Sequence, residues 1–132
     1  MSEPEPHVLT VAVDLDAEGV DLVTLRGELD FASGEPLSTA FAGLTGGWRR
    51  VVVDLAGLEF VDSSGVKMLV AAARAIEGAG GTFVLAGPTA MVRRVFEILH
   101  LADVVTVVES RQAALDEMAR SAPAEARRQG DG

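Results

Sequence analysis

Apolar and polar residues alternate along 8–15 (VLTVAVDL) and again along 20–27 (VDLVTLRG). Such alternation is typical of strands with one buried face, and the turn residues DAEG at 16–19 separate the two segments. We therefore predict an antiparallel hairpin, which the chain leaves at ELD (28–30). The next strand is predicted over 49–61, where three consecutive valines indicate a central strand.

Helical spacing of apolar residues begins after the hairpin. Ser33 is the expected N-cap of a helix that starts near Glu35 and Pro36, because serine favours that position and proline suits a first turn. Leu37, Phe41 and Leu44 have core-facing spacing, and TGG at 45–47 is expected to end this helix.

Further helices are predicted from about Ser64 to Glu77, from Pro88–Thr89 to about Leu99, and from a Ser110 cap to about Arg120. In the second of these, Val92, Val95, Phe96 and Leu99 are expected to share one face. Short strands are predicted at 82–87 and 104–108. The fold class is therefore α/β, with a mixed sheet of about five strands and about four helices packed against it.

Composition adds limits to this picture. The chain has 132 residues, of which 48% are hydrophobic, so we predict one folded domain over 8–120, with disordered segments at 1–7 and 121–132. Cysteine is absent, which excludes a thiolate nucleophile or a cysteine-ligated metal. The net charge of −9 disfavours nucleic acid and anionic membranes as partners. With no signal peptide and no span of about 20 apolar residues, a cytoplasmic location is expected.

The segment LEFVDSSGVKMLV (58–70) places an acid, two hydroxyls and a glycine between a strand and a helix. Asp62, Ser63 or Ser64 could serve as a simple N-cap, which stabilises a helix by about 1 kcal/mol. One cap would suffice, however, and a second acidic stretch, GELD (27–30), ends a strand nearby in the predicted order. If the two strands are neighbours, Glu28 or Asp30 approaches the same edge.

The helix after this segment carries three stripes. Val66, Leu69, Val70, Ala73 and Ile76 form the core face, and Lys67 and Arg74 lie on a polar face. Met68, Ala72 and Ala75 form a third stripe of mostly small residues, one turn beyond Ser64. This stripe suits packing against another element, which we favour, or docking of a partner.

Three segments together resemble STAS-domain anti-sigma factor antagonists: GELD at 27–30, VVVDLAGLEFVDSSGV at 51–66 and FVLAGPTAMVRRVFEILHL at 83–101. The resemblance covers about residues 8–118 and implies a mixed sheet with helices packed on it. It also implies a partner: an anti-sigma factor with serine kinase activity, bound while the antagonist is unphosphorylated so that a sigma factor is freed. Phosphorylation would release the antagonist, and a phosphoserine phosphatase would reverse the switch.

By motif position, the resemblance makes Ser63 the phosphorylation site, with Asp30 and Asp62 beside it and Ser64 as a neighbouring hydroxyl. We expect Asp30, Asp62, Ser64, Gly65, Lys67 and Met68 to bind the partner. Lys67 departs from the family, whose members commonly have a small residue there, and kinase docking or partner choice would differ if it is exposed. Phosphate adds about −1.5 to −2 charges, which a helix N-terminus tolerates and a partner fitted to a neutral serine does not.

Other classes of protein fit the residues less well. A serine hydrolase lacks support, because Ser63 is not in a G-x-S-x-G turn and the only candidate bases are His7 and His100. A phospho-aspartate receiver would use Asp54 or Asp14–Asp16, but its sheet is fully parallel, unlike a hairpin. No metal or cofactor is expected, and no catalytic activity. A STAS scaffold subunit of a stress-signalling complex, which would not dissociate on phosphorylation, stays open as an alternative.

Overall fold

The computed structural model describes residues 8–15, 19–44 and 48–120. The predictions for 1–7 and 121–132, and those for the turns at 16–18 and 45–47, lie outside the described residues. The elements follow in the predicted order, and a short 3₁₀ helix precedes the last strand. They are β1 (Leu9–Leu15), β2 (Asp21–Leu29), α1 (Glu35–Ala42), β3 (Arg50–Val61), α2 (Ser63–Gly78), β4 (Thr82–Ala86), α3 (Ala90–Ile98), η1 (Leu101–Asp103), β5 (Thr106–Val108) and α4 (Arg111–Arg120).

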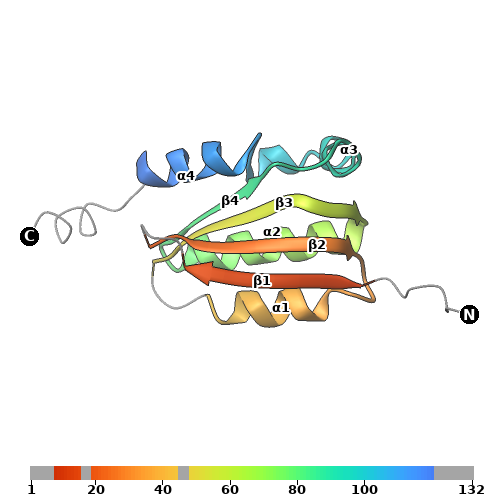
Figure 1. Cartoon of the computed structure of the whole chain (residues 1–132), viewed down its shortest axis with the longest axis horizontal. Coiled ribbons are helices and arrows are strands. Elements are labelled where there is room, and N and C mark those ends of the chain that lie inside the picture. The colour runs from red at the N-terminus through yellow and green to blue at the C-terminus, as the bar shows by residue number, and fades with distance from the viewer. Residues whose placement is uncertain (1–7, 16–18, 45–47, 121–132) are drawn as a thin grey trace, which may run out of the picture.

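The strands form one sheet in the order β1-β2-β3-β4-β5 (Figure 1). β1 and β2 pair antiparallel, which confirms the hairpin. All other neighbours are parallel. The predicted mixed sheet is therefore confirmed, with β3 at its centre.

The helices between parallel strands cover one face of the sheet. Each crossover leads to the next strand in the same direction, and crossovers of this kind are right-handed, so α1, α2 and α3 lie on the same side. Their apolar residues join the inward residues of β2, β3 and β4 in one core. This core contains Leu37 and Phe41 of α1, Leu69 and Ile76 of α2, and Val92 and Phe96 of α3.

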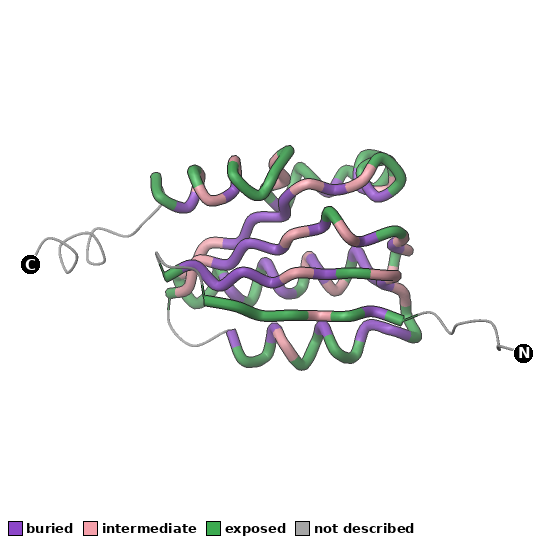
Figure 2. Tube along the Cα trace, viewed as in Figure 1, coloured by how far each residue is buried: buried purple, intermediate pink, exposed green. Residues whose placement is uncertain are grey.

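The opposite face is covered by α4. Ala114 and Met118 of this helix pack with Leu22, Val52 and Val84 of the strands. The three valines that open β3 are therefore all buried, because Val51 and Val53 face one core and Val52 the other. Figure 2 shows the contrast between these buried central strands and the mostly exposed β1.

Several boundaries differ from the sequence-based expectation. Ser110 accepts a hydrogen bond from the Ala113 N–H at 3.0 Å and caps the last helix as predicted. Ser33, by contrast, was wrong as the cap of α1: the N-cap is Gly34, which offers no side chain, because the Ser33 hydroxyl bonds back to the loop before it. α3 ends at Ile98 with Leu99 as its C-cap, within one residue of the predicted end, and Leu99 is 43% exposed. β2 continues through Leu29 instead of ending before ELD.

Candidate functional site

The carboxyl ends of β2 and β3 lie side by side. In the parallel register Leu29 pairs with Val61, and the Asp62 N–H donates to the Leu29 carbonyl at 3.2 Å. The end of GELD and the start of DSSG therefore meet at one edge of the sheet. This is the arrangement expected if the two strands were neighbours.

Asp62 caps α2 and joins it to the loop after β2. Its backbone is extended, and its Oδ1 accepts a hydrogen bond from the Gly65 N–H at 2.8 Å. Its Oδ2 accepts a longer one from the Phe31 N–H at 3.4 Å. The aspartate thus fills the capping role for which the two serines were alternatives.

Ser63 is the first residue of α2, and its side chain is exposed. Within the described part of the chain, its hydroxyl has no hydrogen-bond partner. Ser64, one position on, is half-buried. Backbone N–H groups at a helix start have no intrahelical acceptor and lie at the positive end of the helix dipole. A phosphate on Ser63 would therefore be placed in solvent beside a favourable field.

Asp30 belongs to a tight loop with Ser33. Its Oδ1 accepts hydrogen bonds from the Ser33 hydroxyl at 2.8 Å and from the Ser33 N–H at 2.9 Å. The Ser33 hydroxyl also lies 2.7 Å from the Glu28 carbonyl oxygen and accepts from the Asp30 N–H at 3.1 Å. The geometry thus gives Asp30 a structural role at this edge. Its predicted role in partner binding stays a prediction.

Gly65 lets α2 approach the sheet closely. A Cβ atom there would lie 2.7 Å from the Leu29 carbonyl oxygen, 2.8 Å from the Leu29 Cγ and 2.8 Å from the Val61 Cγ2. Gly65 is buried, so its side-chain position cannot touch a partner. Its predicted partner contact would have to be through backbone atoms, and these short distances show that glycine lets α2 lie close to β2 and β3.

Lys67 and Met68 lie one turn after the serines. Lys67 is exposed, four residues after Ser63 and on the same side of the helix. Met68 is half-buried and packs against Gly34 at the start of α1. It also lines a groove of about 260 Å³ between α1 and α2, together with Phe41, Ala72 and Ala75. The third stripe of α2 thus packs against a neighbouring helix, as favoured, but leaves an open groove.

The sequence analysis did not single out Phe31. This residue is 80% exposed and lies in the loop whose backbone Asp62 holds. Single exposed apolar residues are common on protein surfaces, so Phe31 is of interest here for its place beside Asp62. In the sequence, Phe31 stands out only as an aromatic residue between GELD and Ser33 that fits neither a strand nor a helix periodicity.

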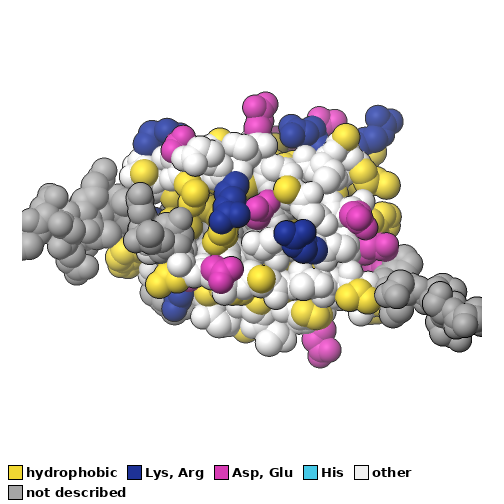
Figure 3. All heavy atoms as spheres, viewed as in Figure 1, with side chains coloured by type: hydrophobic (Ala, Val, Ile, Leu, Met, Phe, Trp, Pro, Cys, Tyr) yellow, Lys and Arg dark blue, Asp and Glu magenta, His cyan; other side chains and the backbone are white. Residues whose placement is uncertain are grey.

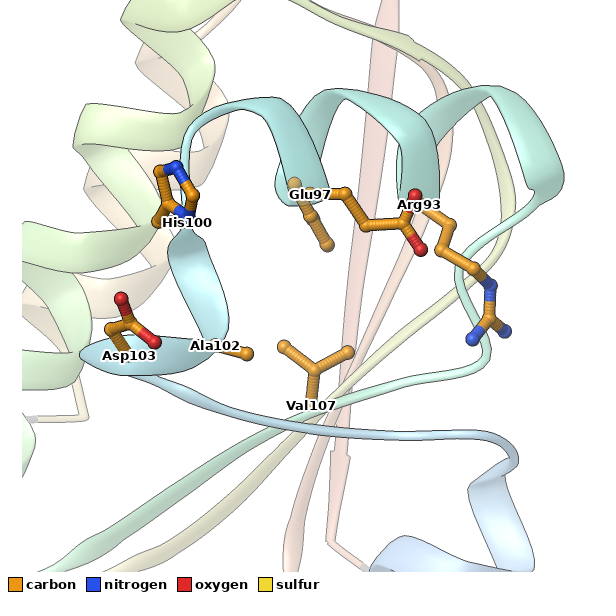
Figure 4. Close-up of a pocket in the computed structure, with 7 residues that line it drawn as sticks. Arg93, Glu97, His100, Ala102, Asp103 and Val107 are labelled. Carbon is orange, nitrogen blue, oxygen red and sulfur yellow. The ribbon is translucent and has the colours of Figure 1, made fainter.

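Two residues considered for other classes of protein, His100 and Asp54, lie among the described residues. His100 lines a cavity of about 350 Å³ with Arg93, Glu97 and Asp103 (Figure 4), and the described lining contains no serine. His7 lies outside the described residues. Asp54, the receiver candidate, accepts a hydrogen bond from the Ala56 N–H and lies 3.7 Å from Arg111 of α4.

In 8–15, 19–44 and 48–120, no three His, Cys, Asp or Glu side chains are grouped so as to hold a metal ion. Within the same ranges, no helix combines the length and the apolar character that a membrane span requires.

Comparisons with known proteins identify the family. The model of the family described as "Mlab, STAS domain" matches residues 12–109. BtrV of Bordetella bronchiseptica, classed as an anti-sigma factor antagonist, is 33% identical over 98 residues, which cover 74% of this chain and 84% of BtrV. The chain therefore belongs to the STAS-domain family of anti-sigma factor antagonists.

Solved structures agree with this assignment. An anti-sigma factor antagonist (STAS) domain protein from Planctomyces limnophilus superposes with a TM-score of 0.70 at 25% identity, over 85% of this chain and 98% of that one. The anti-sigma factor antagonist SpoIIAA in its unphosphorylated form gives a TM-score of 0.63 at 25% identity, over 83% and 96%. The fold predicted from the resemblance is thus the fold of the family.

Proposed function

We propose that this protein is an antagonist of an anti-sigma factor and that phosphorylation of Ser63 switches it off. In this account the unphosphorylated protein binds an anti-sigma factor with serine kinase activity and frees a sigma factor. The kinase transfers a phosphate to the Ser63 hydroxyl, and the modified protein is released until a phosphatase removes the phosphate.

The observation that supports this proposal best is the division of labour at the start of α2. Asp62 caps the helix, so Ser63 is not needed as a cap and its exposed hydroxyl is accessible to a kinase. Support also comes from SpoIIAA, which is similar in structure and is distinguished by an unphosphorylated and a phosphorylated form.

The proposed partner surface surrounds Ser63. It comprises the exposed ring of Phe31, the hydroxyls of Ser63 and Ser64, the exposed Lys67 and the edge of Met68. Apolar and aromatic residues near the centre of an interface usually carry most of its binding energy, whereas a new charge there disrupts binding. Because the Ser63 side chain is exposed, a phosphate there would change affinity with little change in the fold.

Phosphorylation of Ser63 can be tested directly. Wild-type protein, Ser63→Ala and the matched control Ser64→Ala would each be incubated with ATP and the anti-sigma factor kinase encoded in the same genome. Intact mass spectrometry counts the phosphates. We expect one phosphate on wild type and on Ser64→Ala and none on Ser63→Ala. A phosphate that persists on Ser63→Ala would reject Ser63 as the site.

A further inference from the structure

β1 forms an open edge of the sheet. It pairs with β2 on one side, and no other described strand pairs with it. The Glu28 N–H donates to the Val8 carbonyl at 3.0 Å, so Val8 directs its backbone groups toward β2. Antiparallel pairs alternate, and the backbone N–H and C=O groups of Leu9, Val11, Val13 and Leu15 therefore point away from β2, toward the open edge.

This edge has none of the features that usually prevent strand pairing. Natural proteins protect edge strands with lysine, proline, bulges or inward charges. The β1 sequence LTVAVDL contains no lysine, proline or glycine, and its only charge is Asp14. Its register with β2 runs through seven consecutive pairs without a shift. β1 is thus a regular, nearly uncharged template for another strand.

The two halves of β1 differ in burial on the same face. Leu9 is 6% exposed and Val11 is half-buried against the core, whereas Val13 is 44% and Leu15 is 73% exposed. Figure 2 shows most of the strand as exposed, and on the side of the molecule seen in Figure 3 charged side chains are scattered among hydrophobic and uncharged atoms. Apolar surface is therefore left open at one end of the strand.

We propose that this edge pairs with the β1 edge of a second copy of the chain, antiparallel, about a two-fold axis at Ala12. In this register Leu15 lies opposite Leu9 of the second copy and Val13 lies opposite Val11. Each exposed apolar residue thereby packs against one that already belongs to a core. In both pairs the backbone N–H and C=O groups point toward the second copy. They can therefore form the hydrogen bonds of an antiparallel pair.

Charge and helix packing fit the same register. Thr10 is placed opposite Asp14, whereas an axis at Asp14 would oppose two like charges. Centring on Ala12 also pairs all seven residues of the strand. α1 lies beside β1, and its flank away from α2 carries Pro36, Ala40 and Gly43, which are small and uncharged. Because α1 contacts β1, the two α1 helices would come side by side in this dimer, with these small residues between them.

Engineered cysteines test the register, since the chain has none of its own. The Ala12 pair is a non-hydrogen-bonded one, with Cα atoms about 4.5 Å apart, which is within the range that a disulfide spans. Ala12→Cys should form a covalent dimer in a glutathione redox buffer. In Thr10→Cys the two thiols would be about 13 Å apart along the strands, so this control should stay monomeric. A mixture of Thr10→Cys and Asp14→Cys should cross-link.

Sedimentation of the uncross-linked protein supplies a second test. Wild type should show a concentration-dependent dimer, and Val13→Lys, at an already exposed position, should weaken dimerisation at least tenfold. At dilute concentrations, where wild type is monomeric, the two proteins should have the same melting temperature. The proposal is overturned if wild type stays monomeric at high micromolar concentration, or if Thr10→Cys cross-links as readily as Ala12→Cys. Dimerisation is independent of Ser63, so its failure would leave the proposed phosphorylation switch untouched.

Discussion

Ser33 and Ser63 lie close to the starts of two successive helices, each at the carboxyl end of a parallel strand, yet their surroundings differ completely. Ser33 is buried, and its hydroxyl is engaged by Glu28 and Asp30. Ser63 is exposed, and Asp62 alone caps its helix. Before α1, Ser33 holds the loop through its hydrogen bonds and the cap position is Gly34. At the start of α2, Asp62 makes the capping hydrogen bond and the Ser63 hydroxyl stays exposed. Ser63 is available for modification because the neighbouring Asp62 makes the hydrogen bonds that cap the helix.

The glycines of the two helix starts should show the largest contrast. A Cβ at Gly65 would meet the Leu29 carbonyl oxygen at 2.7 Å, whereas one at Gly34 would meet the flexible end of Met68. Gly65→Ala should therefore lower the free energy of unfolding by about 3 kcal/mol, the upper end of the usual cost of overpacking. Gly34→Ala is the matched control and should cost clearly less, because Met68 can move. Urea denaturation measures both, and equal losses would contradict the close approach at Gly65.

The serines themselves provide the next contrast. Ser33→Ala removes one hydrogen bond to the Asp30 N–H and one to the Asp30 carboxylate. We therefore expect the free energy of unfolding to fall by about 2 kcal/mol. Ser63→Ala removes an exposed hydroxyl and should change stability by less than about 0.5 kcal/mol. Thermal and urea unfolding of the two variants would decide this. A destabilised Ser63→Ala would mean that Ser63 contributes to the fold after all.

The capping role of Asp62 predicts a smaller effect. Asp62→Ala removes the acceptor of the Gly65 N–H and should cost about 1 kcal/mol. Asp62→Asn keeps a capping oxygen at the same place and should restore most of that loss. If the alanine variant is as stable as wild type, capping has passed to Ser63 or Ser64, and the division of labour described above is wrong.

Lys67 should produce the smallest effect, and only after phosphorylation. A phosphate on Ser63 would lie one turn before this lysine, in the favourable order of an acid followed by a base four residues later. Lys67→Ala should lower the stability of the phosphorylated protein by about 0.3–0.5 kcal/mol at low salt, and should not affect the unphosphorylated form. The melting temperatures of phosphorylated wild type and phosphorylated Lys67→Ala, each measured with and without added salt, test the pairing of Lys67 with the phosphate.

Much of the fold follows from patterns within single segments. Alternation predicted the hairpin, the valine run predicted the central strand β3, and 3.6-residue spacing predicted the buried face of α2. These signals survive because burial selects apolar residues at each position. Ends of elements were less predictable: the cap of α1 was assigned to Ser33 because local propensity ignores the hydrogen bonds that a residue makes elsewhere in the fold.

The candidate site was only partly predictable in the same sense. The sequence analysis brought GELD and DSSG to one edge by assuming that their strands were neighbours, and the parallel pairing of β2 with β3 confirms that assumption. It could not choose among Asp62, Ser63 and Ser64 as the cap, since all three favour that position. Phe31 was missed because its exposure results from the path of a loop, which no periodicity records.

The most direct measurement of the central claim is the affinity for the anti-sigma factor of wild type, Ser63→Asp and Ser63→Asn, by isothermal titration calorimetry. Aspartate and asparagine have nearly the same shape, so their difference isolates negative charge at Ser63. The account predicts that Ser63→Asp binds at least about 100-fold more weakly than Ser63→Asn, a difference of about 2.8 kcal/mol. Equal affinities for the two variants would contradict a charge switch at Ser63 and would favour a scaffold that stays bound to its partner.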